Sequence, residues 1–196
     1  MPPLVGGLIF ANVAAFLLEQ AFGVSLADWF ALWPPDSGLF MPWQVLTYAF
    51  LHGSVMHLAF NMFGLWMFGA ELERVWGSRR LGVFYTASVL TAAAAQLLVT
   101  SMMGIDVPTI GASGGLFGLL IGFAMVFPHR TLVLLIPPIP MPAWLFVTLY
   151  GLIELTLGVT GSASGVAHFA HLGGLFGGWM MMRYWRSQPP FARLRR

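Results

Sequence analysis

The chain contains no cysteine, no lysine and very few charges of either sign. Its 196 residues include nine Arg and seven Asp or Glu, so that 8% are charged, against about 25% in an ordinary soluble domain. The absence of cysteine excludes disulfides, thiolate metal sites and cysteine nucleophiles. So few charges cannot cover the surface of a soluble domain of this length, which excludes that class of protein.

The residues that are present suit a lipid environment. Apolar residues make up 58% of the chain, the mean hydropathy is +0.81, and a spanning helix needs about 20 mostly apolar residues. We therefore expect an all-α polytopic membrane protein with six transmembrane helices. It would form one membrane domain over residues 1–196, with spans at about 4–22, 54–70, 81–103, 113–127, 142–158 and 164–185 and a basic tail at 186–196.

Arginine is distributed unevenly among the connections between these spans. The connections after the first, third and fifth spans carry no Arg. All nine lie at the end of an even-numbered span or after it: Arg74, Arg79, Arg80, Arg130, Arg183, Arg186, Arg193, Arg195 and Arg196. Connections rich in Arg stay in the cytoplasm. With six spans, both termini are then expected to be cytoplasmic, and each even-numbered helix begins at its outer end.

Three other segments have competing interpretations. The first apolar run lacks the basic region of a signal peptide and continues to Leu18, so we interpret it as a span. The tail at 186–196 has the charge to bind RNA or anionic lipid, but a cytoplasmic orientation signal is the simpler interpretation. The stretch 136–142 contains four prolines, which predicts an irregular connection into the fifth span.

Polar side chains gather near the starts of the even-numbered spans. His57 and Asn61 are four residues apart and share one face of the second helix. Ser113 opens the fourth span, and His168 and His171 follow the start of the sixth. Because these starts all face outward at a similar depth, the three segments can meet. Ionisable residues inside spans are functional candidates, since burying them in hydrocarbon costs free energy.

Glycine ridges would allow two of these helices to approach closely. The repeats have a spacing of four residues and comprise Gly114, Gly118 and Gly122 on the fourth span, with Gly173 and Gly177 or Gly174 and Gly178 on the sixth. Small residues at this spacing permit close contact between helix backbones. The contact would bring a serine hydroxyl near an imidazole.

The chemistry that fits this grouping is acyl transfer. A serine hydroxyl needs a neighbouring base, and His is the usual one. Ser113 with a histidine of the sixth span fits that pair. His57, the amide of Asn61 and the backbone N–H of Ser113 can supply the donors that an oxyanion needs. Each residue also has a structural interpretation, as packing serine, structural or proton-carrying histidine, or helix-bridging asparagine. The residues alone leave a hydrolase and a transporter open.

Together these segments resemble the rhomboid family of intramembrane serine proteases. The family pattern of His and Asn four apart, Gly-x-Ser-Gly, and Ala-His-x-x-Gly is present in order. It stands here as His57 to Asn61, Gly111-Ala112-Ser113-Gly114 and Ala170-His171-Leu172-Gly173. The stretch Pro42 to Tyr48, and Glu73 with Gly77-Ser78, are similar to segments of bacterial members. The resemblance covers about residues 42–178 and implies a rhomboid-like helical bundle.

The resemblance also implies roles for individual residues. Ser113 would be the nucleophile, His171 the general base and acid, and His57 and Asn61 the oxyanion donors. Three further residues would be accessory. His52 would lie at the mouth of the site, and Phe117 would stack on the catalytic histidine, at a position where some members have Tyr. Trp144 would lie with Phe146 and Tyr150 on an aromatic side of the fifth helix, and this side would form part of a gate for substrate entry.

No metal or cofactor is expected. The chain lacks His-Glu-x-x-His, and no carboxylate is close in sequence to these histidines, which favours a Ser–His dyad over a triad. We interpret His168 as a neighbour of the base. Asp106 lies in the outer loop before Ser113, and Glu154 is expected near the outer end of the fifth span, either paired or reaching the interface. Neither has a predicted catalytic role.

The resemblance implies an endopeptidase that cleaves transmembrane segments of other membrane proteins. The expected partners are such substrates and the lipid bilayer, without nucleic acid. The expected location is a cell membrane of bacterial type, with the active site opening to the extracytoplasmic side. The alternative is an inactive member of the superfamily that binds and routes membrane proteins, although such members typically lack the Ser or His present here. A transporter would need an internal repeat or a charged path, and neither is found in the sequence.

Overall fold

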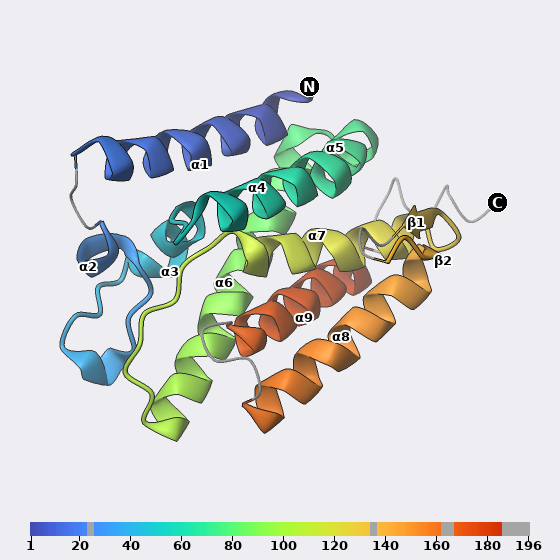
Figure 1. Cartoon of the computed structure of the whole chain (residues 1–196). Coiled ribbons are helices and arrows are strands. Elements are labelled where there is room, and N and C mark those ends of the chain that lie inside the picture. The colour runs from blue at the N-terminus through green and yellow to red at the C-terminus, as the bar shows by residue number, and fades with distance from the viewer. Residues whose placement is uncertain (23–25, 134–136, 162–166, 186–196) are drawn as a thin grey trace.

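The structure, a computed structural model, describes the chain except for residues 23–25, 134–136, 162–166 and 186–196. Helices dominate it (Figure 1). The elements in chain order are α1 (Pro3–Phe22), α2 (Ala27–Phe30), η1 (Pro35–Ser37), α3 (Gln44–Thr47), η2 (Tyr48–Phe50), α4 (Val55–Gly64), η3 (Leu65–Gly69), α5 (Ala70–Trp76), α6 (Ser78–Met103), α7 (Ser113–Val126), β1 (Thr131–Val133), β2 (Pro140–Pro142), α8 (Ala143–Thr160) and α9 (His168–Trp185).

The long helices fall where apolar runs predicted them. Helices α1, α6 and α8 contain segments long and apolar enough to cross a membrane, and α7 is a shorter apolar helix. The helical run that contains the second predicted span extends beyond it, because α4, η3 and α5 follow one another without a break as far as Trp76. The sixth corresponds to α9, and residues 164–166 of that prediction lie outside the described residues. The helical, polytopic class is confirmed, while the number of spans stays a prediction.

Helix α7 lies at the centre of the bundle. Nine of its fourteen residues are buried, and it packs against α6, α8, α9 and η3. Both glycine ridges of α9 are used. A side chain at Gly174 would overlap the carbonyl oxygen of Gly114, and a Cβ at Gly178 would lie 2.8 Å from the carbonyl oxygen of Gly118. Gly173 faces α6, where a Cβ would lie 2.6 Å from the Cβ of Ala95.

Residues between α1 and α4 connect to the loop that precedes α7 and to α6. Leu32 pairs with Thr109 in an isolated antiparallel bridge. The backbone N–H of Gly111 donates to the carbonyl oxygen of Tyr48 at 2.9 Å. The Tyr48 hydroxyl donates to the carbonyl of Val89 at 2.9 Å, and burial raises the pKa of that hydroxyl above its ordinary value. The segment that leads into α7 is therefore held by hydrogen bonds to Leu32 and to Tyr48.

One predicted loop contains regular structure. We expected residues 136–142 to be irregular, but β2 pairs antiparallel with β1, with Leu132 opposite Met141. Proline is compatible with such a pair when it lies on an edge strand and its missing N–H faces away from the partner. The expectation was wrong for Pro140 to Pro142, and Ile136 lies outside the described residues.

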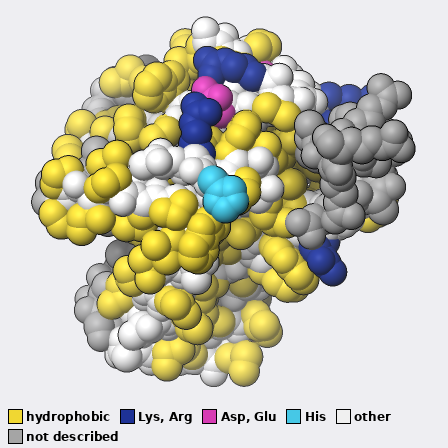
Figure 2. Space-filling view, turned by 90° about the vertical axis from the view of Figure 1, so that its right-hand side faces the viewer, with side chains coloured by type: hydrophobic (Ala, Val, Ile, Leu, Met, Phe, Trp, Pro, Cys, Tyr) yellow, Lys and Arg dark blue, Asp and Glu magenta, His cyan; other side chains and the backbone are white. Residues whose placement is uncertain are grey.

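The described arginines lie toward one end of the bundle. They belong to the end of α5, the start of α6, the turn after α7 and the end of α9. Figure 2 views the molecule from the side of β1 and β2 and shows basic side chains gathered among hydrophobic ones. Arg80 lies over the ring of Trp185 at 6.0 Å, which brings the start of α6 to the end of α9. This grouping agrees with the charge segregation in the sequence.

Glu73 joins the start of α1 to the start of α6. Its carboxylate accepts the backbone N–H groups of Leu4 and Val5, each at 2.9 Å, and the hydroxyl of Ser78 at 2.6 Å. The two N–H groups belong to the first turn of α1, where no intrahelical acceptor exists. Burial acts to raise the pKa of Glu73, but the hydrogen bonds from Ser78, Val5 and Leu4 outweigh it and lower the pKa below its ordinary value.

Replacing Glu73 with Gln is expected to destabilise the protein by about 2 kcal/mol, because hydrogen bonds to a buried charge are lost. The folded pKa is lower than the unfolded value, so the carboxylate contributes fully above about pH 4.5 and progressively less as the pH falls through the folded pKa. Thermal unfolding in detergent should show a difference between variant and wild type that shrinks in acid. Glu71→Gln is the control, since its exposed pairing with Arg74 contributes less than about 1 kcal/mol. A Glu73→Gln protein as stable as this control would contradict the prediction.

Candidate active site

The structure brings Ser113 and His171 into hydrogen-bonding contact. Ser113 is the first residue of α7, and His171 lies in the first turn of α9. His171 Nε2 is 2.8 Å from Ser113 Oγ. The glycine contacts between α7 and α9 place the two backbones close enough for side chains of this length to meet. A hydroxyl and an imidazole at this distance form the pair that activates a serine for nucleophilic attack.

Gly111 brings His57 to the same place. It has φ +121, a conformation that residues with side chains rarely adopt. A Cβ on Gly111 would lie 2.7 Å from His57 Nε2 and 3.8 Å from Ser113 Oγ. The absence of a side chain at Gly111 thus leaves room for the imidazole beside the serine. Ser54 caps α4 by accepting the backbone N–H of His57 at 3.1 Å, which fixes the start of the helix two residues before the histidine.

Asn61 lies one turn along α4 from His57 and is buried. Its Nδ2 donates to the carbonyl oxygen of His57 at 2.9 Å. An amide nitrogen carries two hydrogens, so one N–H remains for another acceptor. The backbone N–H of Ser113 is likewise in the first turn of a helix, where N–H groups have no intrahelical acceptor.

Rings of His52 and Phe117 border these groups. His52 meets His57 edge to face, with centroids 4.9 Å apart. Burial, followed by the neighbouring charge of His57, lowers the pKa of His52 to about 4, so it is uncharged at neutral pH. Phe117 stacks on His171 at 4.3 Å with an interplanar angle of 10°. Tyr150 of α8 packs on Phe117 at 5.4 Å and stacks on Phe146 at 5.5 Å.

A carboxylate lies next to the histidines, contrary to what their sequence neighbours indicated. Oε2 of Glu154 is 2.9 Å from Nδ1 of His171 and 2.6 Å from Nδ1 of His168. All three side chains are buried. Glu154 belongs to α8, and both histidines belong to the next helix, α9. No carboxylate is close to His171 along the sequence, but the fold brings Glu154 to it.

The same three side chains form the one group able to hold a metal ion in the described part of the chain. Their ligand atoms lie within 4.8 Å of one another. Ligand atoms of a tetrahedral zinc ion stand about 3.3 Å apart, given bonds of about 2.0 Å. The separations of 2.6 and 2.9 Å between Nδ1 and Oε2 are shorter and suit hydrogen bonds. The arrangement fits a proton-sharing cluster better than a metal site.

Two other residues considered from the sequence lie apart from this group. Trp144 is exposed near the start of α8, about 15 Å along the helix from Glu154 at 1.5 Å per residue. Its accessory role stays a prediction. Asp106 is exposed in the loop between α6 and α7. Of the other predicted residues, Phe117 stacks on His171, and His57 lies beside Gly111, two residues before Ser113. His52 and Asn61 contact His57.

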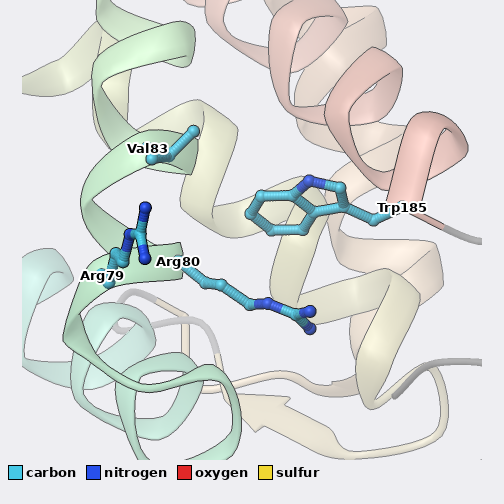
Figure 3. Close-up of a pocket in the computed structure, with 4 residues that line it drawn as sticks. All are labelled: Arg79, Arg80, Val83 and Trp185. Carbon is cyan, nitrogen blue, oxygen red and sulfur yellow. The ribbon is translucent and has the colours of Figure 1, made fainter. Parts of the chain in front are cut away.

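A surface pocket lies at the opposite end of α9. It has a volume of about 260 Å³ and is lined by Arg79, Arg80, Val83 and Trp185. Figure 3 shows the Arg80 side chain extending below the indole of Trp185, between the start of α6 and the end of α9. Trp185 is 14 residues after His171, which corresponds to about 21 Å along the helix. This pocket is separate from the serine.

Glu154 is the member of the site that sequence reasoning placed without a role. A signal for it was available, because Glu154 is the one charged residue in the apolar helix α8. An ionisable residue inside a span is expected to have a partner and a function. The partner was hidden because 14 and 17 residues separate Glu154 from the histidines, so no local spacing links them.

Comparison with known proteins supports the resemblance. The family model described as the Rhomboid domain matches residues 39–188. The chain is 31% identical over 140 residues to the mitochondrial Rhomboid protein 1 of Saccharomyces cerevisiae, covering 67% of this chain and 38% of that protein. It is 28% identical over 191 residues to the Rhomboid protease GlpG of Serratia proteamaculans, covering 95% of this chain and 63% of that one.

A third relative is the Rhomboid protease GluP of Bacillus subtilis, 31% identical over 137 residues. The match covers 69% of this chain and 24% of that relative. Each of these matches therefore covers less than two thirds of the relative's own length. The matched region contains α4, α7 and α9, the three helices that carry the predicted catalytic side chains.

Proposed function

The chain belongs to the rhomboid family, and we propose that it is an intramembrane serine endopeptidase that cleaves transmembrane segments of other membrane proteins. The observation that carries this proposal is the 2.8 Å contact between His171 Nε2 and Ser113 Oγ. It joins two helix starts that are 58 residues apart in sequence. Protease relatives in the family add support for the class of reaction.

The proposed reaction begins when His171 takes the proton of the Ser113 hydroxyl as the oxygen attacks a peptide carbonyl carbon. A tetrahedral intermediate forms, with negative charge on the former carbonyl oxygen. His171 then gives the proton to the leaving amine, and the peptide C–N bond breaks to leave an acyl-serine. His171 then takes a proton from a water molecule as the water oxygen attacks the ester carbon. The bond between that carbon and Ser113 Oγ breaks, and His171 returns the proton to Oγ, which frees the new carboxyl end and restores the serine hydroxyl.

The intermediate needs donors aimed at its oxygen. We assign this role to the His57 side chain, the free N–H of the Asn61 amide and the backbone N–H of Ser113. His57 and Asn61 belong to α4, whereas His171 meets Ser113 Oγ from α9. Phe117 holds the plane of the imidazole by stacking on it. Donors fixed before the reaction stabilise the developing charge without reorganisation.

A transmembrane substrate must expose its backbone before it can react. A helical backbone keeps its carbonyl groups hydrogen-bonded within the helix, so the substrate has to unwind locally beside Ser113. Segments with small residues at the cut and helix-breaking residues after it are the expected substrates. The aromatic contacts among Phe117, Phe146 and Tyr150 lie between α7 and α8, where such a segment would enter.

We also propose the orientation in the membrane. Six spans with both termini in the cytoplasm would place the described arginines on the cytoplasmic side and Ser113 toward the outer side. Water would then reach the serine from the extracytoplasmic face. The bundle of α1 and α4 to α9 supports this arrangement, because Ser113 begins α7 and Arg130 follows its other end.

The proposal is tested by cleavage in a defined bilayer. The purified protein is reconstituted into liposomes with a single-span reporter that has small residues followed by Gly and Pro near its outer end. Mass spectrometry of the products should place the cut within or beside the span. Binding of the reporter without cleavage by a folded protein would instead support a binding and routing function.

Replacing Asn61 with Ala is expected to lower kcat by about 10²-fold and leave residual activity, because other oxyanion donors remain. Asn12→Ala is a closely matched control. Asn12 is also buried, and its Nδ2 donates to the carbonyl of Leu8 four residues earlier at 2.8 Å, but it lies on α1. Reporter cleavage and thermal unfolding should both be measured. An Asn61→Ala protein that unfolds, or one no slower than the Asn12→Ala control, would favour a purely structural role.

A further inference from the structure

We propose that Glu154 is a positioning residue for catalysis, which sets the proton position and the orientation of the His171 imidazole through a carboxylate shared with His168. The inference rests on the proposed function, since His171 has to act as a base for its proton position to matter. It adds Glu154 to the expected Ser–His dyad as a third member that orients His171.

The geometry begins with one carboxylate oxygen. Oε2 of Glu154 contacts Nδ1 of His171 at 2.9 Å and Nδ1 of His168 at 2.6 Å. The same imidazole of His171 presents its other nitrogen, Nε2, to Ser113 Oγ at 2.8 Å. A continuous chain of three polar contacts thus runs from the serine through His171 and the carboxylate to His168.

This chain fixes the tautomer of His171. An ionised carboxylate only accepts hydrogen bonds, so each histidine that bonds to it must carry a hydrogen on Nδ1. A neutral imidazole has one N–H, which leaves Nε2 of His171 without a hydrogen and able to accept the proton of Ser113. The opposite tautomer would put an N–H toward the serine and could not act as its base. Glu154 therefore selects the tautomer that the reaction requires.

Glu154 also supplies a negative charge that stabilises the imidazolium formed during the reaction. When His171 takes the serine proton it becomes an imidazolium, and the carboxylate is already 2.9 Å away. The groups that face His171 from the neighbouring elements are His57 on α4, Ser113 and Phe117 on α7, Glu154 on α8 and His168 on α9. Glu154 is the one acid in that set of described residues.

The position of Glu154 in its helix points the same way. Helix α8 has 18 residues, of which three are buried, and Glu154 is one of those three. An apolar helix whose single charged side chain turns inward bears a cost of desolvation that its hydrogen bonds must offset. A residue serving only to hold α8 on the bundle would not need to contact the Nδ1 of the histidine that meets the serine.

His168 completes the arrangement by holding the carboxylate in place. It is bonded to the same Oε2 as His171, and its ring stands nearly perpendicular to that of His171, at 89°. Two donors on one oxygen restrict its rotation more than one donor would. We expect His168 to contribute less than Glu154, because the bond between Glu154 and His171 persists without it.

The test compares Glu154→Gln, His168→Asn and, as a matched control, Glu19→Gln. Glu19 is the other acid inside an apolar helix and lies on α1. A Gln side chain is neutral and replaces one carboxylate oxygen by an NH2 donor group. It is therefore a poorer acceptor for the N–H groups at Nδ1 of His168 and His171. Cleavage of the liposome reporter by Glu154→Gln should fall by about 10² to 10⁴-fold in kcat with KM changed by less than threefold. His168→Asn should lose about tenfold or less, and Glu19→Gln nothing.

A second readout is independent of turnover. In protein labelled with ¹⁵N on histidine, NMR should show His171 of the wild type protonated on Nδ1, and this signature should be lost in Glu154→Gln. A merely structural contact would not change the tautomer of a folded variant. If Glu154→Gln fails to fold, the wild-type spectrum still decides the matter, because His171 protonated on Nε2 would overturn the inference.

The outcomes separate this inference from the proposed function. A wild type that cleaves the reporter, with Glu154→Gln within threefold of it, would overturn the role of Glu154 and leave the protease proposal intact. A folded wild type that neither cleaves the reporter nor reacts with a fluorophosphonate would overturn both. A loss confined to kcat, together with loss of the Nδ1 signature, is the result that the inference predicts.

Discussion

Replacing either Ser113 or His171 with Ala is expected to abolish cleavage of a transmembrane reporter, with a loss of at least about 10⁴-fold in kcat. The serine would lose the oxygen that attacks, and the histidine the base 2.8 Å from that oxygen. Both variants should stay folded, because each removes a small group from the end of a helix pair that is held together by backbone contacts between α7 and α9.

The double variant gives the more specific result. Two groups that act as one unit do not contribute separately, so Ser113→Ala with His171→Ala should be no slower than either single variant. Ser101→Ala and His129→Ala are the controls, since both residues are exposed and lie outside the site. Losses that multiply in the double variant would show that the two side chains act independently and would contradict a shared catalytic step.

Replacing Gly174 with Ala is expected to have the second large effect, on the fold itself. The new Cβ would overlap the carbonyl oxygen of Gly114 in α7, and backbone cannot move aside as a flexible side chain can. Helices α7 and α9 would have to separate, at a cost of about 3 kcal/mol. Because Ser113 and His171 begin these two helices, the separation would also break their contact and lower cleavage.

Gly7→Ala provides the control for this change. Gly7 lies on α1 with nothing within 4 Å of an added Cβ, so alanine there should be neutral or stabilise the helix by about 0.5–1 kcal/mol. Thermal unfolding of both variants in the same detergent measures the difference, and fluorophosphonate labelling reports the site. A Gly174→Ala protein as stable as wild type and fully reactive would show that the two helices do not pack as the structure has them.

Much of this fold was predictable because apolar runs and glycine spacings can be recognised within one short segment of sequence. Helix α6 ends at Met103, where the third span was predicted to end, and α7 begins at Ser113. The two glycine ridges on α9 could not be distinguished from the sequence, and the structure uses both. Gly174 and Gly178 face α7, while Gly173 and Gly177 face α6.

What the sequence did not reveal depends on contacts between distant segments. Glu154 is the single acid of α8, and Glu73 lies on α5; the partners of both lie on other helices. The pairing of β1 with β2 was missed because prolines indicate irregular structure when the partner strand is unknown. The proximity of Ser113, His171 and His57 followed from the predicted helix directions. Their catalytic roles remain predictions.

The most direct measurement of the central claim is the reaction of the protein with a fluorophosphonate, which labels an activated serine covalently. Mass spectrometry should place the label on Ser113 in wild type, and labelling should disappear in both Ser113→Ala and His171→Ala. The reaction should be repeated in lipid bilayers to exclude inactivation by detergent. A folded wild type that stays unlabelled in both media, or a label on another serine, would contradict an intramembrane serine protease that uses Ser113.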